Sequence, residues 1–110
     1  MWRILTTRWR QKYRTMAYPQ GDAPKLPPRF AGRPALDDLH CRADCNACIA
    51  ACPTGAISRD GDSGVALDTG LCLFCRACQR ACPNGAIRFT DDYQLAAAAR
   101  EDLLVRSAWA

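Results

Sequence analysis

The sequence predicts a small α+β domain with pseudo-twofold symmetry, preceded by an amphipathic helix and a proline-rich arm and followed by a short helix. Three observations support this fold class. A cysteine-rich unit occurs twice, the first 18 residues carry large apolar side chains at helical intervals, and five of the seven prolines lie between Pro19 and Pro34. We therefore expect a helix and docking arm over residues 1–34, the duplicated domain over 35–92 and a helical tail over 93–110.

The repeat consists of nine identities at an offset of 30 residues. Cys45, Ala47, Cys48, Ala51, Cys52, Pro53, Gly55, Ala56 and Ile57 recur as Cys75, Ala77, Cys78, Ala81, Cys82, Pro83, Gly85, Ala86 and Ile87. Each unit predicts a cysteine loop, one short helix that stops at the proline, and a strand that begins near Ile57 or Ile87. Residues 61–64 then predict a turn, and residues 65–67 the returning strand.

The flanking segments have different compositions. In residues 1–18, apolar side chains are spaced by three and four residues with basic ones mostly between them, which predicts a basic amphipathic helix. The apolar set is Trp2, Leu5, Trp9, Tyr13 and Met16. The prolines that follow disfavour helix and predict an extended arm. The segment from Tyr93 to Val105 is rich in alanine and leucine, so we expect it to be helical.

Charge and hydropathy narrow the location of the protein. Residues 1–34 carry eight basic residues and one acid, a charge of +7, whereas residues 35–110 carry seven basic and ten acidic residues, a charge of −3. No signal peptide is visible, because arginines interrupt the N-terminal apolar residues, and we therefore expect a reducing cytoplasm and no disulfides. The apolar run Leu95–Ala99 is far shorter than the roughly 20 residues that span a membrane.

The cysteine spacing indicates iron–sulfur chemistry. The second unit reads Cys72-x2-Cys75-x2-Cys78-x3-Cys82-Pro83, the bacterial pattern in which the fourth cysteine ligates the other cluster of a pair. The first unit has one extra residue between Cys41 and Cys45, where we expect a bulge. We predict two [4Fe–4S] clusters with crossed ligand sets. One cluster takes Cys41, Cys45, Cys48 and Cys82, and the other takes Cys72, Cys75, Cys78 and Cys52.

Over residues 41–90 the chain resembles the bacterial two-cluster ferredoxins, and it is similar to the ferredoxin-type subunits of complex I and of membrane-bound [NiFe] hydrogenases such as formate hydrogenlyase. The Tyr18-Pro19 step, the segment Phe30–Pro34 and the run Tyr93–Leu95 carry the wider resemblance. It implies a ferredoxin-like fold and electron transfer at the inner face of the cell membrane. It also implies protein partners, namely a small Fe–S subunit and a [NiFe]-type large subunit or their complex I equivalents.

Other interpretations of the same residues are weaker. A zinc site does not require three closely spaced cysteines followed by x3-Cys-Pro, and this chain has that pattern twice, so zinc binding is the weaker interpretation. His40, beside Cys41, is expected to be a loop residue rather than a ligand, and Phe74 to pack rather than to shield a cluster. The basic arm lacks a repeated base-stacking platform, so we expect no nucleic acid. Trp2 and Trp9 instead favour a membrane surface or a partner's groove as the site where residues 1–18 dock.

The predicted function is therefore electron transfer. The sequence contains no paired nucleophile and base and no glycine-rich phosphate loop, so we expect no catalysis by this chain alone. We expect it to relay single electrons within a multi-subunit, membrane-associated oxidoreductase. A freely diffusing ferredoxin and a structural Fe–S subunit are the alternatives, and redox measurements distinguish them.

Overall fold

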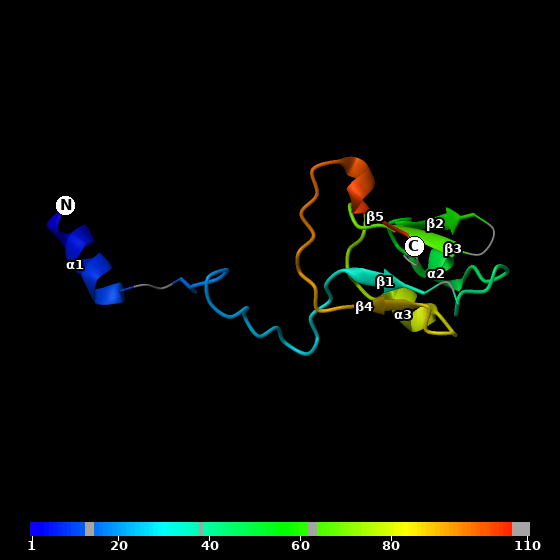
Figure 1. The fold of residues 1–110 in the computed structure, drawn as a ribbon, viewed down its shortest axis with the longest axis horizontal. Coiled ribbons are helices and arrows are strands. Elements are labelled where there is room, and N and C mark those ends of the chain that lie inside the picture. Colours follow the sequence, from blue (N-terminus) through cyan, green and yellow to red (C-terminus); the bar gives the residue numbers. More distant parts are fainter. Residues whose placement is uncertain (13–14, 38, 62–63, 107–110) are drawn as a thin grey trace.

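Strands and short helices gather in one body, and the N-terminal helix lies apart from it (Figure 1). The structure, a computed structural model, describes residues 1–12, 15–37, 39–61 and 64–106. Its extents are 67 × 29 × 27 Å, and the long dimension comes from α1 (Trp2–Gln11) and the arm, defined here as residues 15–33. Within the described ranges, no helix has the length and apolar character needed to span a membrane.

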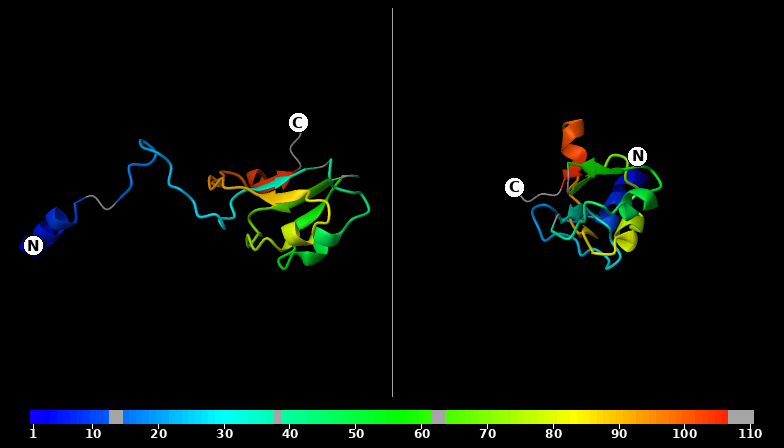
Figure 2. Two further views of the ribbon diagram at one scale, coloured as in Figure 1. Left: turned by 90° about the horizontal axis from the view of Figure 1, so that it is seen from below. Right: turned by 90° about the vertical axis from the view of Figure 1, so that its right-hand side faces the viewer.

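The body confirms the predicted α+β class, with two small antiparallel sheets and two short helices. The sheets contain β1 (Pro34–Leu36) with β4 (Ile87–Phe89), and β2 (Ile57–Asp60), β3 (Gly64–Asp68) and β5 (Leu104–Arg106), in that order. The helices α2 (Ala47–Ala51) and α3 (Ala77–Ala81) contact each other and lie on one side of the strands (Figure 2). Pro34 begins β1, so the sheet starts within the segment that we assigned to the arm.

The repeat is confirmed and extends further upstream than its cysteines. Strands β2 and β4 begin at Ile57 and Ile87, as predicted, and these residues pair with Leu67 and Leu36. The first unit has one extra residue, so the offset between equivalent positions upstream of it is 31 residues instead of 30. Leu36 of the first unit is therefore equivalent to Leu67 of the second. The pseudo-twofold relation therefore includes strands β1 and β3 as well as the cysteine loops and helices.

Backbone hydrogen bonds follow the same symmetry. The Asp37 N–H donates to the Ala86 carbonyl over 2.9 Å, and the Asp68 N–H donates to the Ala56 carbonyl over 2.8 Å. Each aspartate side chain then accepts from the N–H two residues on, at Leu39 and Gly70. These turns, formed by the aspartate side chains, direct the chain from each strand into its cysteine loop.

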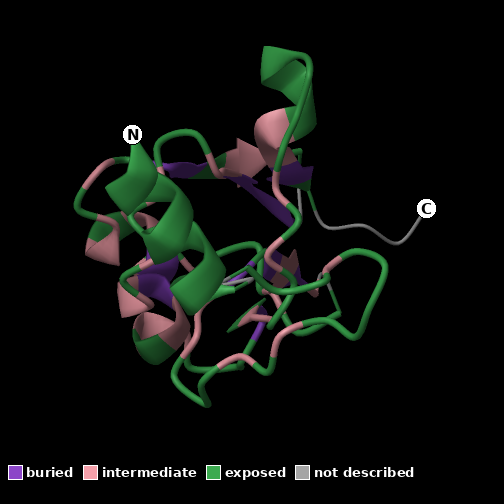
Figure 3. Ribbon diagram, turned by 90° about the vertical axis from the view of Figure 1, so that its left-hand side faces the viewer, coloured by how far each residue is buried: buried purple, intermediate pink, exposed green. Residues whose placement is uncertain are grey.

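The hydrophobic core is small and lies between the helices and the strands. Its cluster consists of Leu36, Cys48, Ile57, Val65, Leu67, Cys78, Ile87 and Val105. Figure 3 shows the buried residues concentrated in the strands and helices of the body, whereas α1 is exposed throughout. Two of these eight residues are cysteines, so the cysteine loops contribute side chains to the hydrophobic core.

The N-terminal helix is shorter than predicted. It ends at Gln11, and Lys12 has a φ of 51°, so Met16 lies outside it. Tyr13 of the predicted apolar set lies outside the described residues. Trp2 and Trp9 are 80% and 85% exposed. The apolar spacing therefore forms a helix that buries none of its residues against this chain.

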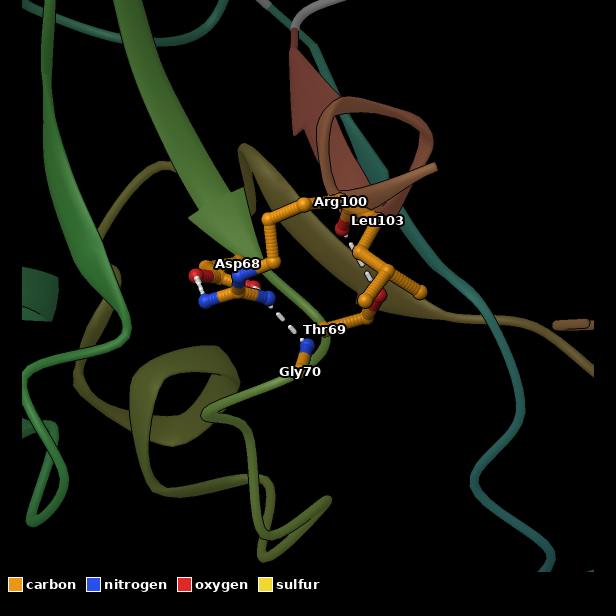
Figure 4. A network of polar contacts seen from close by, with 5 residues as sticks. All are labelled: Asp68, Thr69, Gly70, Arg100 and Leu103. Atoms are coloured by element: carbon orange, nitrogen blue, oxygen red, sulfur yellow. Dashed lines mark hydrogen bonds and ion pairs between the residues drawn. The ribbon is translucent and has the colours of Figure 1, made fainter. Parts of the chain in front are cut away.

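The prediction of a helix over residues 93–105 is wrong for most of that segment. A short 3-10 helix spans Arg100–Leu103, and β5 follows it along the free edge of β3. Helix propensity is a weak preference. Here it is outweighed because Leu104–Arg106 pair with the backbone N–H and C=O groups of β3 and because Val105 becomes buried. Figure 4 shows the junction, where the N–H and hydroxyl of Thr69 both donate to the Leu103 carbonyl, over 3.0 and 2.7 Å.

The arm lies against the body at both of its ends. Near its start, the rings of Tyr18 and Tyr93 meet edge to face at 6.0 Å, and the Gln94 side-chain amide donates to the Tyr18 hydroxyl. Near its end, the Gly32 N–H donates to the Thr90 carbonyl over 2.7 Å. A Cβ on Gly32 would lie 2.3 Å from the Asp92 carbonyl oxygen, so only glycine fits there.

Candidate iron–sulfur site

Seven of the cysteines fall into two groups, and each group includes cysteines from both units. A cavity in the body is lined by Cys72, Cys75 and Cys78 of the second unit together with Cys52 of the first. On the other side, Cys48 lies near Cys41 of its own unit and Cys82 of the second, whose charges act on its thiol. Cys45 completes that loop, and its N–H donates to the Arg42 carbonyl over 3.1 Å.

The pKa values of the buried thiols reflect this crowding. Burial is the main cause that raises the pKa of Cys78 to about 11, and the charges of Cys72 and Cys52 add to it. Burial likewise raises the pKa of Cys48, with Cys41 and Cys82 adding to the effect. Thiols in this state ionise readily only when a cation compensates their charge, which bound iron provides.

Cys52 and Cys82, the fourth cysteines of the two units, are held by matching turns. The Ala56 N–H donates to the Cys52 Sγ and the Ala86 N–H to the Cys82 Sγ, both over 3.3 Å. Each turn contains a glycine with positive φ, and Gly55 of the first turn has a φ of 65°. Glycine adopts this backbone without strain, which explains its recurrence at both positions.

Cys52, which is half-buried, differs from the buried Cys48 and Cys78 in its hydrogen bonds. Burial alone would raise its pKa, but the Thr54 hydroxyl and nearby backbone N–H groups outweigh burial and lower the pKa. The Thr54 Oγ1 lies 3.6 Å from the Cys52 Sγ. Position 84 of the second unit, which corresponds to Thr54, is an asparagine. The hydroxyl therefore belongs to only one of the two turns.

The two cysteine loops also differ. The extra residue in the first loop forms a turn closed by the Cys45 N–H and the Arg42 carbonyl, in the place where we expected a bulge. In the second loop, the Phe74 N–H donates to the Cys72 Sγ over 3.3 Å, and its ring meets Phe89 edge to face at 6.2 Å. The Phe74 ring thus packs against Phe89, as predicted, and the Phe74 backbone also contacts the Cys72 sulfur.

His40 lies in the loop before Cys41, and its side chain is exposed. Its Nδ1 is 2.5 Å from the Asp37 carboxylate. In the second unit, the Arg100 Nη2 lies 2.5 Å from the corresponding carboxylate of Asp68. Partial burial opposes ionisation of Asp68, but Arg100 and the Gly70 N–H hold the pKa of Asp68 below its usual value.

The chemistry of the site fits two cubane clusters. Four thiols surround one cavity, and two buried arginine nitrogens near the loops, Arg59 Nη1 and Arg76 Nε, have no hydrogen-bond partner among the described residues. An acceptor such as a cluster sulfur satisfies nitrogens of this kind. In the described ranges, no group of three or more His, Cys, Asp or Glu side chains is arranged to hold a single metal ion. A cube differs from such a site because its four thiolates bind four separate irons.

Known proteins resemble this chain in its cysteine region and in its fold. Residues 40–86 match the 4Fe-4S dicluster domain. No curated protein sequence matches the chain. Among solved structures, one chain of the membrane-bound sulfane sulfur reductase, an archaeal respiratory membrane complex, aligns with a TM-score of 0.69 and 29% identity. The alignment covers 90% of this chain but only 56% of that one. The cysteine region is therefore similar to an electron-transport 4Fe-4S dicluster domain, and this match together with the eight cysteines shows a protein of two [4Fe–4S] clusters.

Proposed function

We propose that this protein is an electron-transfer subunit of a membrane-associated oxidoreductase complex, in which it relays single electrons through two clusters with crossed ligand sets. The observation that carries the proposal is the shared cavity, in which Cys52 of the first unit joins Cys72, Cys75 and Cys78 of the second. When bound, each cluster accepts and releases one electron. The polypeptide binds the clusters, positions them and tunes their potentials.

The grouping of seven of the thiols, together with the place of Cys45 in the first cysteine loop, supports two ligand sets. Cys41, Cys45, Cys48 and Cys82 hold the first cluster, and Cys72, Cys75, Cys78 and Cys52 hold the second. Helices α2 and α3 contact each other, and each one ends at the cysteine that crosses to the other unit. This arrangement keeps the two clusters adjacent, as an electron relay requires.

Two features support a role inside a complex. The aligned chain of the sulfane sulfur reductase belongs to a respiratory membrane complex and matches nine-tenths of this chain, including the flanks of the dicluster domain. Helix α1 exposes Trp2, Leu5 and Trp9, with basic residues between them. We assign α1 as the anchor at the inner face of the membrane or in a partner's groove. The partner subunits are those of a hydrogenase, a complex I or a related respiratory complex.

A pull-down from native membranes tests this function. The full-length tagged protein, extracted in mild detergent, should co-purify with membrane and redox subunits, and its clusters should be reduced when the complex turns over. A variant with Trp2, Leu5 and Trp9 changed to glutamine should keep eight irons, the number that two cubes contain, but leave the complex. Recovery of the wild-type protein alone, with reducible clusters, would identify a free ferredoxin. Clusters that resist strong reductants would indicate a structural role.

A further inference from the structure

Arg76 lies between the second cluster cavity and the arm. It follows Cys75 directly, and its side chain lines the cavity together with the four cysteines. The same side chain lines a groove between the arm and the body, opposite Phe30. Among the described residues, it is the arginine that borders both of these spaces.

The arm holds the guanidinium of Arg76 in place. Its Nη2 donates to the carbonyl oxygens of Arg29 and Phe30, over 2.9 and 2.5 Å. Residues 27–30 form the turn that presents these carbonyls, closed by the Phe30 N–H and the Pro27 carbonyl at 2.9 Å. The Arg76 Nε is buried and has no hydrogen-bond partner among the described residues. A buried charged donor without a partner is costly, so an acceptor in the adjacent cavity is expected.

The backbone of Arg76 is strained in a way that its counterpart is not. Arg76 has a φ of 61°, in the left-handed region that side chains other than glycine rarely adopt. The corresponding residue of the first unit, Asn46, has a φ of −118°. Phe74 of the same loop also has a positive φ, of 55°. A strained backbone in one copy of a duplicated loop and not at the corresponding Asn46 points to a functional constraint on the second loop.

We propose that Arg76 raises the reduction potential of the cluster bound by Cys72, Cys75, Cys78 and Cys52, and that the seated arm maintains this effect. Reduction adds one electron, and therefore one negative charge, to the site. A fixed guanidinium and its N–H stabilise that added charge. Because linkage is reciprocal, a partner that moves the arm changes the potential of this cluster but not that of the other. The inference rests on the proposed ligand sets and relay.

Redox titrations of the full-length, cluster-loaded protein, followed by EPR with dithionite as the electron donor, test this proposal. The change Arg76→Met removes the charge, and it should lower the reduced-to-oxidised ratio of the second cluster about tenfold at fixed potential, a shift of about 59 mV. Arg76→Lys keeps the charge and should recover part of the shift. Arg59→Met is the matched control, because Arg59 contacts Cys45 and Asn46 of the other loop. It should leave the second cluster unchanged.

A double-mutant cycle tests the role of the arm. Pro28→Gly loosens the turn that presents the two carbonyls and should lower the second cluster's potential, by less than Arg76→Met does. The same change made together with Arg76→Met should have no further effect. A shift that persists without Arg76, or no shift from Pro28→Gly, would overturn the coupling. If the wild-type clusters are reducible but Arg76→Met leaves the second cluster's potential unchanged, the tuning role alone is wrong. If the wild-type clusters cannot be reduced, the relay is wrong as well.

Discussion

The two cysteine units share their ligands and turns but differ in what surrounds them. In the first unit, Arg59 of β2 donates to the Asn46 side chain and to the Cys45 carbonyl. In the second unit, Phe89 occupies the position of Arg59, and Arg76 occupies that of Asn46. The first loop is thus held from within the body, whereas the second loop is held by the arm. The two cysteine loops therefore lie in different electrostatic environments.

Gly32→Ala should have the largest effect, because Gly32 is where the arm contacts the segment just after β4. An added Cβ would lie 2.3 Å from the Asp92 carbonyl oxygen and 2.8 Å from that of Thr90, so the backbone must shift. The temperature at which the visible cluster absorbance is lost should fall by roughly 10–20 °C. Gly21→Ala is the control, since its Cβ would approach nothing closer than 3.4 Å. Equal effects of the two changes would contradict the seating of the arm.

Arg59→Met should weaken the first loop and spare the second. It removes the donor groups to Cys45 and Asn46, and hydrogen bonds from a charged group contribute about 1.5–3 kcal/mol. On gradual warming, the EPR signal of the first cluster should therefore disappear before that of the second. Phe89→Leu, at the corresponding position, should affect the second loop instead and by less, because an aromatic pair contributes about 0.5–1.5 kcal/mol. Simultaneous loss of both clusters in Arg59→Met would show that the loops are not independent.

The pH dependence of cluster binding should be similar in the two units. Cys48 and Cys78 are buried at corresponding positions, and both have raised pKa values. Both are protonated near neutral pH and must release a proton to bind iron, so higher pH favours binding. Between about pH 7 and 9, the equilibrium should shift about tenfold per pH unit for each thiol that releases a proton. Competition with an iron chelator, corrected for the chelator's own protonation, measures this shift. A flat profile would contradict the raised pKa values.

Thr54→Val should give the smallest change. The Thr54 hydroxyl lies 3.6 Å from the Cys52 Sγ, and the second unit has no counterpart hydroxyl. Loss of one hydrogen bond of about 0.5–1.5 kcal/mol should lower the potential of the cluster bound through Cys52 by roughly 20–60 mV. Asn84→Val serves as the matched change in the other turn. If Thr54→Val instead moved the potential of the cluster bound by Cys41, Cys45 and Cys48, then Cys52 would not ligate the second cluster.

Sequence reasoning found the elements that depend on local spacing. The duplicated helices and the strands that begin at Ile57 and Ile87 follow from the repeat, and the cysteine spacing predicted two clusters. The correspondence of Asp37 with Asp68 was missed, because the extra residue before Cys45 shifts the offset to 31. Comparing the two units at both offsets would have found it.

Features that depend on distant contacts were not predictable in this way. The tail segment after Tyr93 has helix-forming residues, yet the free edge of β3 binds Leu104–Arg106 as a strand. The contact of Arg76 with the arm joins positions 46 residues apart through backbone carbonyls, which carry no sequence signal. The strained φ of Arg76 is likewise visible only in the structure.

The crossed ligand sets are the central claim, and four single cysteine-to-serine variants test them most directly. EPR spectra and iron content of the reduced proteins should group Cys82→Ser with Cys48→Ser, both damaging the first cluster. They should group Cys52→Ser with Cys78→Ser, both damaging the second. If Cys82→Ser instead matched Cys78→Ser, and Cys52→Ser matched Cys48→Ser, each unit would bind its own cluster and the crossed arrangement would be wrong.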